Sequence, residues 1–329
     1  MAAFCTNIGS NPLLVQGAGG NVSWKDQDIL WIKASGTWLA HAQNKPIFVP
    51  VDLAALNKEI SLGNFFVKPK LTIDTLLRPS IETLLHALLP HPIVVHIHAI
   101  EALSFLVLKD QQVIFEKIQQ LMGEPLLLIP YHQPGSSLAI AVYNALQGTK
   151  SKVRCLLLKN HGVILGASSI PEMKELIDAL QNACQTISHS INFSLSKNEF
   201  IENFSGYSPA EDPQIHSLAC NPDLYQRLSH EWVLFPDHAV FLGPHAFLFP
   251  SSKEFKIYLR RHKAPQLIFI ENQGVYYQDT FTAAQKVQLK CYLDLLRIID
   301  PSAQLNPLSQ SEINHLLKRD DEKFRLVQK

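Results

Sequence analysis

The stretch Ile93-Val94-Val95-His96-Ile97-His98 decides the fold, because it has the apolar, β-branched composition of a buried strand and carries two histidines. Successive side chains of a strand point to opposite faces, so His96 and His98 share one face while Val95 and Ile97 face a core. Each imidazole in such an apolar setting needs a polar partner. A shared metal ion would supply one, and the alternative is a polar crevice without metal. The pattern favours the metal.

A third histidine follows another apolar strand. The run Val153–Leu158 leads into Lys159-Asn160-His161-Gly162, and strand ends are where α/β proteins place reactive groups. The glycine permits a backbone turn that a side chain would obstruct. His161 is therefore a candidate third ligand, because three histidines form a common catalytic zinc set that leaves one position open. In isolation, a histidine in an ordinary strand-end turn is the simpler interpretation.

The segment that leads into the first strand carries a carboxylate. In Pro79-Ser80-Ile81-Glu82, Ser80 suits a helix cap and Glu82 suits the first turn, where the helix dipole favours negative charge. These preferences explain both residues structurally. The expected helix nevertheless runs directly into the histidine-bearing strand, so Glu82 could reach the same metal as a ligand or as a base. His86 lies one turn later on the same face, and we expect His91 to be exposed in a Pro-His-Pro turn.

Two loops near the N-terminus are rich in small residues. Gln16-Gly17-Ala18-Gly19-Gly20-Asn21-Val22-Ser23 lets backbone N–H groups converge on an anion. It lacks the Lys-Ser/Thr of a P-loop and the spacing of a dinucleotide fingerprint, which argues against nucleotide binding. Lys33-Ala34-Ser35-Gly36-Thr37 is the second such turn. Either could be a plain turn, but together with Ser80 at a helix N-terminus they could form a phosphate pocket.

Short apolar runs alternate with helical patterns in the first half of the chain. We expect strands over residues 28–32, 47–51, 93–98, 126–129 and 153–158, and helices over residues 80–89, 99–108, 110–122, 136–146 and 171–191. Residues 196–212 are polar and contain proline and glycine. That composition predicts a linker between a domain of residues 1–195 and a second unit of residues 213–329.

The second unit has the pattern of a smaller α+β unit. Residues 267–270 and 275–277 flank the turn Glu271-Asn272-Gln273-Gly274 and predict a hairpin. A helix is expected to carry Val287, Cys291, Leu295 and Ile298 on one face, and a last one covers residues 311–324. Pro236-Asp237-His238 could bring a carboxylate and an imidazole to a substrate. A turn before a strand over residues 240–242 is the interpretation that we favour.

The bulk composition narrows the choice of partners and compartment. The 29 basic and 29 acidic residues of this 329-residue chain balance, which gives no electrostatic case for nucleic acid or an anionic membrane. No apolar stretch approaches the ~20 residues of a membrane helix, and the start lacks the pattern of a secretory signal. The five scattered cysteines, none with CxxC spacing, indicate reduced thiols and a cytoplasmic location.

Together these motifs resemble the class II aldolase/adducin family. The family pattern is a glycine-rich G-N-x-S loop, a small S-G or T-G loop, a P-S-S-E helix start, an H-x-H strand and an N/H-H-G strand end. The matching residues occur in the same order, at Gly19–Ser23, Ala34–Thr37, Pro79–Glu82, His96–His98 and Asn160–Gly162. Each motif is weak alone, but five in register form a strong match.

The resemblance implies a metal-dependent sugar-phosphate aldolase, similar to those for fuculose 1-phosphate and rhamnulose 1-phosphate. One zinc ion per subunit would be held by His96, His98 and His161. Glu82 would bind the metal at rest and act as acid/base. The substrate phosphate would be held by Gly20, Asn21, Ser35, Gly36 and Ser80.

The resemblance also implies a fold and an assembly. We expect an α/β/α layered domain with a mixed or largely antiparallel sheet, followed by the smaller α+β unit. Relatives form cyclic tetramers with sites near subunit interfaces, so a homo-oligomer is expected. The sequence of residues 80–91 is similar to a segment in the aldolase part of long bifunctional rhamnulose-phosphate aldolase/dehydrogenase proteins. Some longer members of the family carry a C-terminal extension, and two motifs of that extension resemble Pro236–His238 and Asp321–Arg325 of this chain.

Three departures from the family pattern leave the reaction open. Ile81 replaces the second serine of P-S-S-E, the connection from Glu82 to the histidine strand is short, and the small aldolases' catalytic tyrosine has no match, because Tyr131 aligns with a different one. An epimerase or dehydratase on the same scaffold is one alternative. A metal-free, adducin-like interaction module is another, which the retained histidines disfavour. A dehydrogenase lacks its dinucleotide motif.

Overall fold

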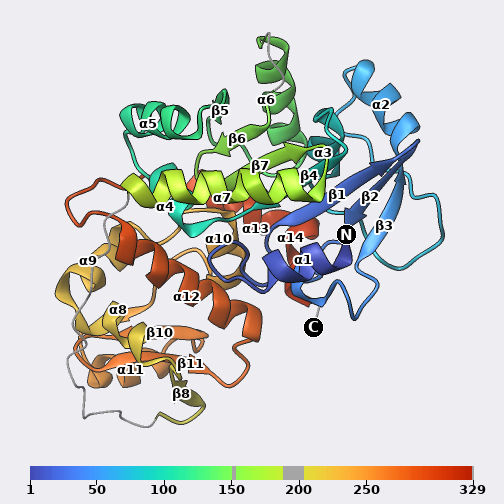
Figure 1. The fold of residues 1–329 in the computed structure, drawn as a ribbon. Helices are drawn as coiled ribbons and strands as arrows, with labels where there is room; N and C mark the ends of the chain where they lie inside the picture. The colour runs from blue at the N-terminus through green and yellow to red at the C-terminus, as the bar shows by residue number, and fades with distance from the viewer. Residues whose placement is uncertain (150–152, 188–203, 328–329) are drawn as a thin grey trace.

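The first half of the chain forms a large sheet in a computed structural model that describes residues 1–149, 153–187 and 204–327 (Figure 1). The seven strands lie in the order β3-β2-β1-β4-β7-β6-β5, and every neighbouring pair is antiparallel except β5 and β6. The strands are β1 (Asn21–Asp26), β2 (Ile29–Lys33), β3 (Phe48–Asp52), β4 (Ile93–Ile97), β5 (Leu126–Ile129), β6 (Cys155–Leu158) and β7 (Gly162–Ala167). The predicted mixed, largely antiparallel sheet is confirmed.

Helices cover both faces of this sheet, as the alternation of β4 requires. Val95 and Ile97 belong to the core beneath α1, α4 and α7, whereas Val94 belongs to the core beneath α3 and α6. The helices of this half are α1 (Ala2–Gly9), α2 (Leu53–Ser61), α3 (Thr83–Leu88), α4 (Ile100–Leu106), α5 (Gln112–Met122), α6 (Ser136–Gln147) and α7 (Ile170–Ile187), with the short 3₁₀ turn η1 (Leu39–His41). The α/β/α layering is therefore confirmed, and residues 188–191 of the helix predicted to follow Pro171 lie outside the described residues.

Two strands that the sequence did not predict flank β4. The Asn21 end of β1 pairs with His96, and Ile164 of β7 pairs with His96 from the other side. The start of β1 is the end of the glycine-rich segment, where the sequence predicts a turn. β7 is the continuous apolar run Gly162–Ala167, without the alternation that marks a half-exposed strand, because this central strand is buried on both faces.

The environment of α3 corrects two further expectations. The helix begins at Thr83 rather than Ser80, and Glu82 occupies the capping position. Ser80 Oγ instead accepts a hydrogen bond from Glu82 N at 3.2 Å. His91 is buried, not exposed, because its ring packs where Gly166 of β7 has no side chain. The Pro-His-Pro turn thus docks on the sheet.

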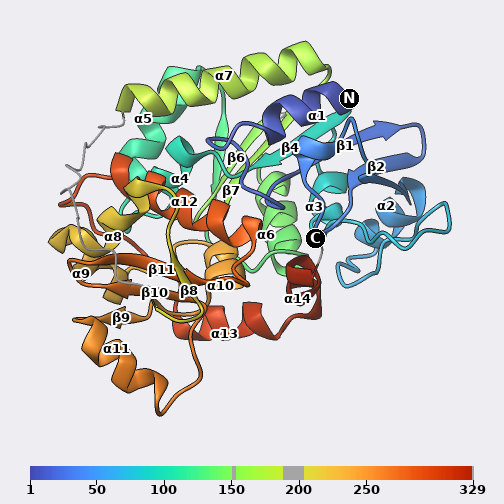
Figure 2. The ribbon, with the colours of Figure 1, turned by 90° about the horizontal axis from the view of Figure 1, so that it is seen from below.

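The second half of the chain builds a smaller α+β unit around a four-stranded sheet of order β8-β11-β10-β9 (Figure 2). Its strands are β8 (Tyr207–Pro209), β9 (Leu248–Phe249), β10 (Leu267–Ile270) and β11 (Gly274–Gln278). The predicted hairpin is the antiparallel pair β10 and β11. β8 lies inside the segment predicted as a linker and pairs with β11, while residues 196–203 of that segment lie outside the described residues.

The helices of this unit differ from expectation at two points. They are η2 (Pro213–His216), α8 (Ser217–Cys220), α9 (Pro222–His230), α10 (Pro236–Leu242), α11 (Ser252–Leu259), α12 (Ala283–Ile298), α13 (Gln310–Lys318) and α14 (Asp320–Val327). Pro236–His238 is not a turn before a strand but the first turn of α10, a position that suits proline and an acidic residue. The last helix breaks in two at Arg319, whose backbone is extended.

The two units share a hydrophobic core. Ile100, Leu103 and Val107, from α4 and its C-terminal cap, belong to the same buried cluster as the apolar residues of α9, α10 and α12. Asn160, at the end of β6, donates hydrogen bonds from Nδ2 to the carbonyls of Leu234 at 2.9 Å and Asn306 at 2.7 Å. The C-terminal unit therefore packs directly on the strand ends of the large sheet.

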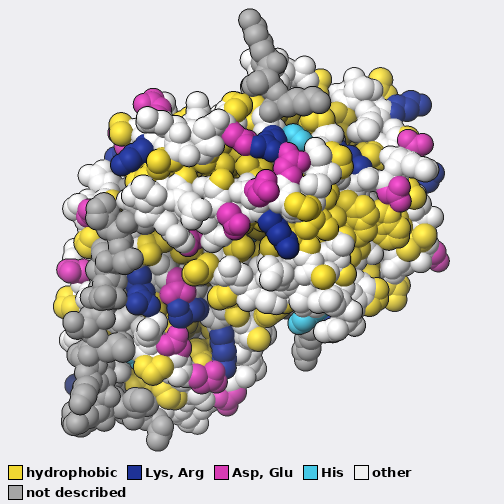
Figure 3. Space-filling model, viewed as in Figure 1, with side chains coloured by type: hydrophobic (Ala, Val, Ile, Leu, Met, Phe, Trp, Pro, Cys, Tyr) yellow, Lys and Arg dark blue, Asp and Glu magenta, His cyan; other side chains and the backbone are white. Residues whose placement is uncertain are grey.

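Charges of both signs are mixed on the surface. On the face drawn in Figure 3, Lys and Arg side chains are interspersed with Asp and Glu side chains. This mixture agrees with the balanced net charge of the sequence. Among the described residues, no helix combines the length and the apolarity that crossing a bilayer requires.

Replacing Gly162 with alanine should destabilise the metal-free protein. A Cβ at this position would lie 2.6 Å from the Ile97 carbonyl oxygen and 2.9 Å from the His98 ring. Overpacking of this kind costs about 1 to 3 kcal/mol. Urea unfolding in the presence of chelator measures the loss. Gly148→Ala is the control, since Gly148 has a φ of −78° and its nearest neighbour is 3.5 Å away. Equal stability of the two variants would contradict the steric argument.

Candidate metal centre

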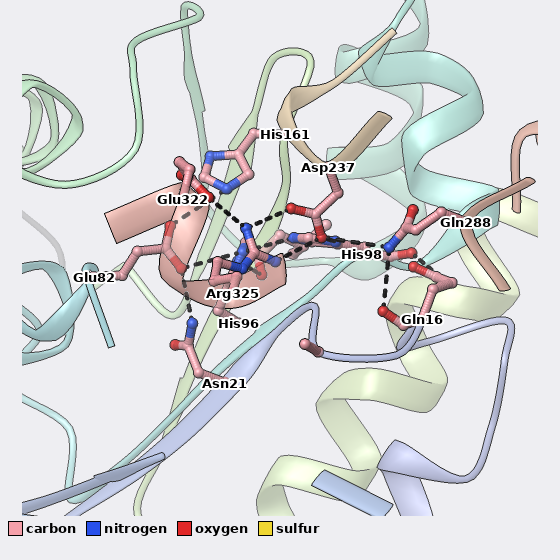
Figure 4. Close-up of polar contacts among 12 residues, drawn as sticks. Gln16, Asn21, Glu82, His96, His98, His161, Asp237, Gln288, Glu322 and Arg325 are labelled. Carbon is pink, nitrogen blue, oxygen red and sulfur yellow. Dashed lines mark hydrogen bonds and ion pairs between the residues drawn. The ribbon is translucent and has the colours of Figure 1, made fainter. Parts of the chain in front are cut away.

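The end of β4 and the turn after β6 bring three histidines close together (Figure 4). His96 and His98 extend from the end of β4, and His161 follows β6 in a tight turn where Asn160 adopts a left-handed φ of 51°. All three side chains are buried, and their candidate ligand atoms lie within 4.8 Å of one another. The group could hold a metal ion.

The hydrogen bonds of His96 define which nitrogen faces the centre. Nδ1 lies 3.1 Å from the Val163 carbonyl oxygen, which can only accept, so Nδ1 carries the proton. Nε2 is left with a lone pair and lies 3.0 Å from His98 Nε2. A carbonyl that fixes the tautomer of a histidine in this way is the usual outer partner of a metal ligand.

Glu82 completes a four-membered donor set. Its Oε2 lies 3.5 Å from His96 Nε2, its Oε1 lies 3.3 Å from His161 Nε2, and Asn21 Nδ2 donates to Oε2 at 2.8 Å. Ligand atoms about 2.0 to 2.1 Å from a tetrahedral zinc ion are separated by roughly 3.3 Å. The observed separations match that spacing. Among the described residues, nothing donates a hydrogen bond to the buried Glu82 Oε1, which a cation would satisfy. The residues present therefore fit a zinc-type ion.

Burial and neighbouring polar groups set the charge states of His98, His161 and Glu82. Burial lowers the pKa of His161 to about 4 and holds the pKa of His98 well below its usual range, so both rings are neutral at pH 7. Burial by itself raises the pKa of Glu82, but His96, His161 and the Asn21 hydrogen bond outweigh it and lower that pKa to about 2. Neutral imidazoles and an ionised carboxylate are the forms that bind metal.

The predicted substrate residues surround the same site. The structure brings Gly20 and Asn21 of the first loop, Ser35 and Gly36 of the second, and Ser80 to the wall of one pocket with the three histidines and Glu82. The other lining residues are Ala18, Lys33, Ile81, Pro134, Pro236, Asp237 and Arg325. Segments far apart in the sequence therefore converge on one pocket, and three of the additional residues are charged.

Lys33 ties the two small-residue loops together. Its Nζ donates to the Ala18 carbonyl at 3.0 Å and to the Thr37 carbonyl at 2.6 Å. The side chain is buried, and burial lowers its pKa to about 7. Lys33 stands beside one of the motifs, but no local pattern predicts its burial. Its cationic form suits a pocket that receives an anionic group.

Asp237 and Arg325 line the site, although sequence reasoning assigns neither to it and favours a turn as the interpretation of Pro236–His238. Asp237 comes from α10 and Arg325 from α14, and the two form an ion pair with an Nη1–Oδ1 distance of 2.7 Å beside His98 (Figure 4). A signal was present for Asp237, because it is an acidic residue inside the apolar run 232–242. Arg325 lies in a highly charged helix, where one more charge carries no signal.

Comparisons with known proteins assign the first half of the chain to a protein family. Residues 1–188 match the family model described as Class II Aldolase and Adducin N-terminal domain. The uncharacterized oxidoreductase YuxG of Bacillus subtilis is 29% identical over 201 residues, which cover 56% of this chain and 29% of that protein. The chain thus spans less than a third of the length of this curated relative.

Solved structures are similar to slightly more than half of the chain. The N-terminal class II aldolase domain of a conserved Thermoplasma acidophilum protein is 24% identical, with a TM-score of 0.48, 56% of this chain covered and 91% of that one. The L-fuculose-1-phosphate aldolase of Thermus thermophilus is 17% identical, with a TM-score of 0.38, 56% of this chain covered and 91% of that one.

Proposed function

Since the chain belongs to the class II aldolase and adducin family, we propose that it is a zinc-dependent lyase acting on a ketose 1-phosphate. The substrate would be of the rhamnulose or fuculose type, and the products dihydroxyacetone phosphate and an aldehyde. The observation that carries the proposal is the donor set of His96, His98, His161 and Glu82, whose neighbouring atoms are 3.0 to 3.5 Å apart. It lies in a pocket lined by the two small-residue loops.

The residues divide the chemistry between them. Bound zinc would supply Lewis-acid polarisation of a substrate carbonyl and stabilise the negative charge that develops beside it. His96, His98 and His161 hold that ion. Retro-aldol cleavage would break the C3–C4 bond: the ionised Glu82 would take up the proton that the C4 hydroxyl loses as C4 becomes the aldehyde, and a proton would be returned to C3. Glu82 carries the proton at C3, and the Asn21 amide fixes one of its oxygens.

The phosphate is assigned to the part of the pocket that the two small-residue loops and Ser80 line. Gly20, Asn21, Ser35, Gly36 and Ser80 line it there, and the Lys33 ammonium holds both loops. Backbone N–H groups and hydroxyls are the donors that phosphate oxygens accept from. Because Ile81 stands where the family has a second serine, one hydroxyl fewer is available, and a lower affinity for the phosphate is expected.

We further propose that the chain forms a homo-oligomer, a tetramer by resemblance to relatives. The segment between α2 and α3 exposes large apolar side chains, with Phe66 81% and Leu76 99% exposed. Contiguous exposed apolar surface marks interaction sites, and these side chains are candidates for such a surface. Light scattering of the purified protein tests this, and a monomer would contradict it.

The test of the reaction is a product analysis on the zinc-loaded chain. The protein is stripped with chelator, reloaded with zinc and incubated with fuculose 1-phosphate or rhamnulose 1-phosphate, and dihydroxyacetone phosphate is measured by enzyme-coupled reduction. We expect its release with zinc and none after chelation. Formation of an epimeric sugar phosphate without release of dihydroxyacetone phosphate would identify an epimerase. Loss of water from the substrate would identify a dehydratase. Reduction of added NAD⁺ would identify a dehydrogenase. If the protein neither binds zinc nor turns over any of these substrates, it would be an adducin-like interaction module.

A further inference from the structure

Asp237 of the C-terminal unit faces a metal-site histidine of the first unit. We propose that Asp237 positions His98 for metal binding by accepting the hydrogen of His98 Nδ1, and that Arg325 holds the carboxylate in place. The inference rests on the proposed metal centre. It gives the C-terminal unit a part in that centre, although none of the five motifs that mark the site lies in this unit.

The geometry places the carboxylate behind the ring. Asp237 is buried, with 2% of the residue exposed, and its Oδ2 lies 3.6 Å from His98 Nδ1. His98 Nε2 points the other way, toward His96 Nε2. His98 Nδ1 is buried and has no hydrogen-bond partner among the described residues. One nitrogen of His98 thus faces the centre, and the other faces Asp237.

The tautomer of His98 explains the 3.6 Å separation. His96 carries its proton on Nδ1, so its Nε2 accepts, and His98 must donate to it from Nε2. His98 Nδ1 then presents a lone pair to a carboxylate oxygen, and no hydrogen bond can form. A metal ligand needs the lone pair on Nε2, which moves the proton to Nδ1. In that tautomer Asp237 becomes the acceptor, as in the carboxylate–histidine–zinc arrangement of metal sites.

Three helices hold the carboxylate in position. Arg325 of α14 binds both of its oxygens, Nη1 to Oδ1 at 2.7 Å and Nη2 to Oδ2 at 3.0 Å, a bidentate geometry. Glu322, one turn earlier, accepts from the same guanidinium at 3.0 Å. Gln288 Nε2 of α12 lies 3.5 Å from Oδ2. Asp237 itself lies in the first turn of α10, and these contacts leave its side chain little freedom to turn away from His98.

The test compares zinc affinity among variants of the full chain by competition with a chelator. Asp237→Ala should weaken zinc binding about 10- to 100-fold, the usual effect of losing an outer partner of a ligand. That variant also removes one of the two carboxylates that pair with Arg325, so the Arg325 charge is only partly compensated near the metal. The double variant Asp237→Ala/Arg325→Met removes this charge, and we expect it to remain at least about 10-fold weaker than the parent. Glu211→Gln, which breaks an exposed ion pair with Lys286, is the matched control.

A second readout separates positioning from general destabilisation. Cobalt(II) replaces zinc, and the imidazole N–H of His98 then gives an exchangeable, paramagnetically shifted proton resonance. It should be sharp and protected from exchange in the parent, lost in Asp237→Ala, and kept in Glu211→Gln. Asp237→Asn retains an acceptor of the same shape and should recover part of the signal. This variant keeps the test decisive if the alanine variant does not fold.

The outcomes separate this inference from the proposed reaction. Full zinc affinity in the double variant, or an unchanged resonance in Asp237→Ala, would overturn the role of Asp237 and leave the lyase proposal intact. A parent that binds zinc through an Asp237-dependent His98 but cleaves no ketose phosphate would overturn the reaction alone. A parent that binds no zinc would overturn both.

Discussion

Replacing His161 with alanine should abolish zinc binding at any practical concentration and, with it, turnover. The loss of a direct ligand should exceed the ~100-fold upper range seen for outer partners. His161 Nε2 also lies 3.3 Å from Glu82 Oε1, so its removal frees the carboxylate as well as a coordination position. Since Lewis-acid stabilisation contributes several kcal/mol, we expect activity to fall at least ~10³-fold.

Metal content after dialysis and thermal unfolding measure the effect of His161→Ala. Zinc at about 100 times its dissociation constant stabilises a protein by ~2.7 kcal/mol, so added zinc should raise the melting temperature of the parent and leave that of the variant unchanged. His96→Ala should behave in the same way. His230→Ala, at an exposed site on α9, is the control and should keep its zinc. Stoichiometric zinc in both site variants would show that the metal is held elsewhere.

Replacing Glu82 with glutamine should slow turnover by about 10²- to 10⁴-fold, the range for loss of a general acid or base. The amide keeps the shape of the side chain and can still accept from Asn21, but it cannot take up a proton. Zinc should remain bound, because the three histidines are retained. The expected signature is therefore a low kcat at full metal occupancy, unlike the histidine variants.

The measurement for Glu82→Gln is kcat on zinc-loaded protein with the metal content determined in the same sample. Glu172→Gln provides a matched control, since that glutamate pairs with Arg154 and neither residue lines the pocket of the site. Undiminished kcat at full occupancy would remove Glu82 from the proton transfer. Loss of zinc together with activity would assign it the role of a ligand only.

Much of the site could be predicted because local patterns encode it. The alternation along β4 puts His96 and His98 on one face, whatever surrounds the strand. Glu82 precedes the helix that leads into that strand, so chain connectivity alone brings the carboxylate near. His161 needed a further fact, namely that β6 and β7 form a hairpin beside β4, and only the run of matching motifs pointed to it.

What the sequence by itself determined was the pair His96 and His98 and the small-residue loops, which follow from residues near one another in the chain, and, through the run of matching motifs, the third histidine and the layered sheet. Only the tertiary structure decided the part of the C-terminal unit. Arg325 pairs with Asp237 across 88 positions, and Asn160 binds the Asn306 carbonyl across 146 positions. Such pairs leave no local pattern, because the packing of α10, α12 and α14 against the strand ends creates them. An acidic residue in the first turn of a helix is ordinary until that helix is placed beside His98.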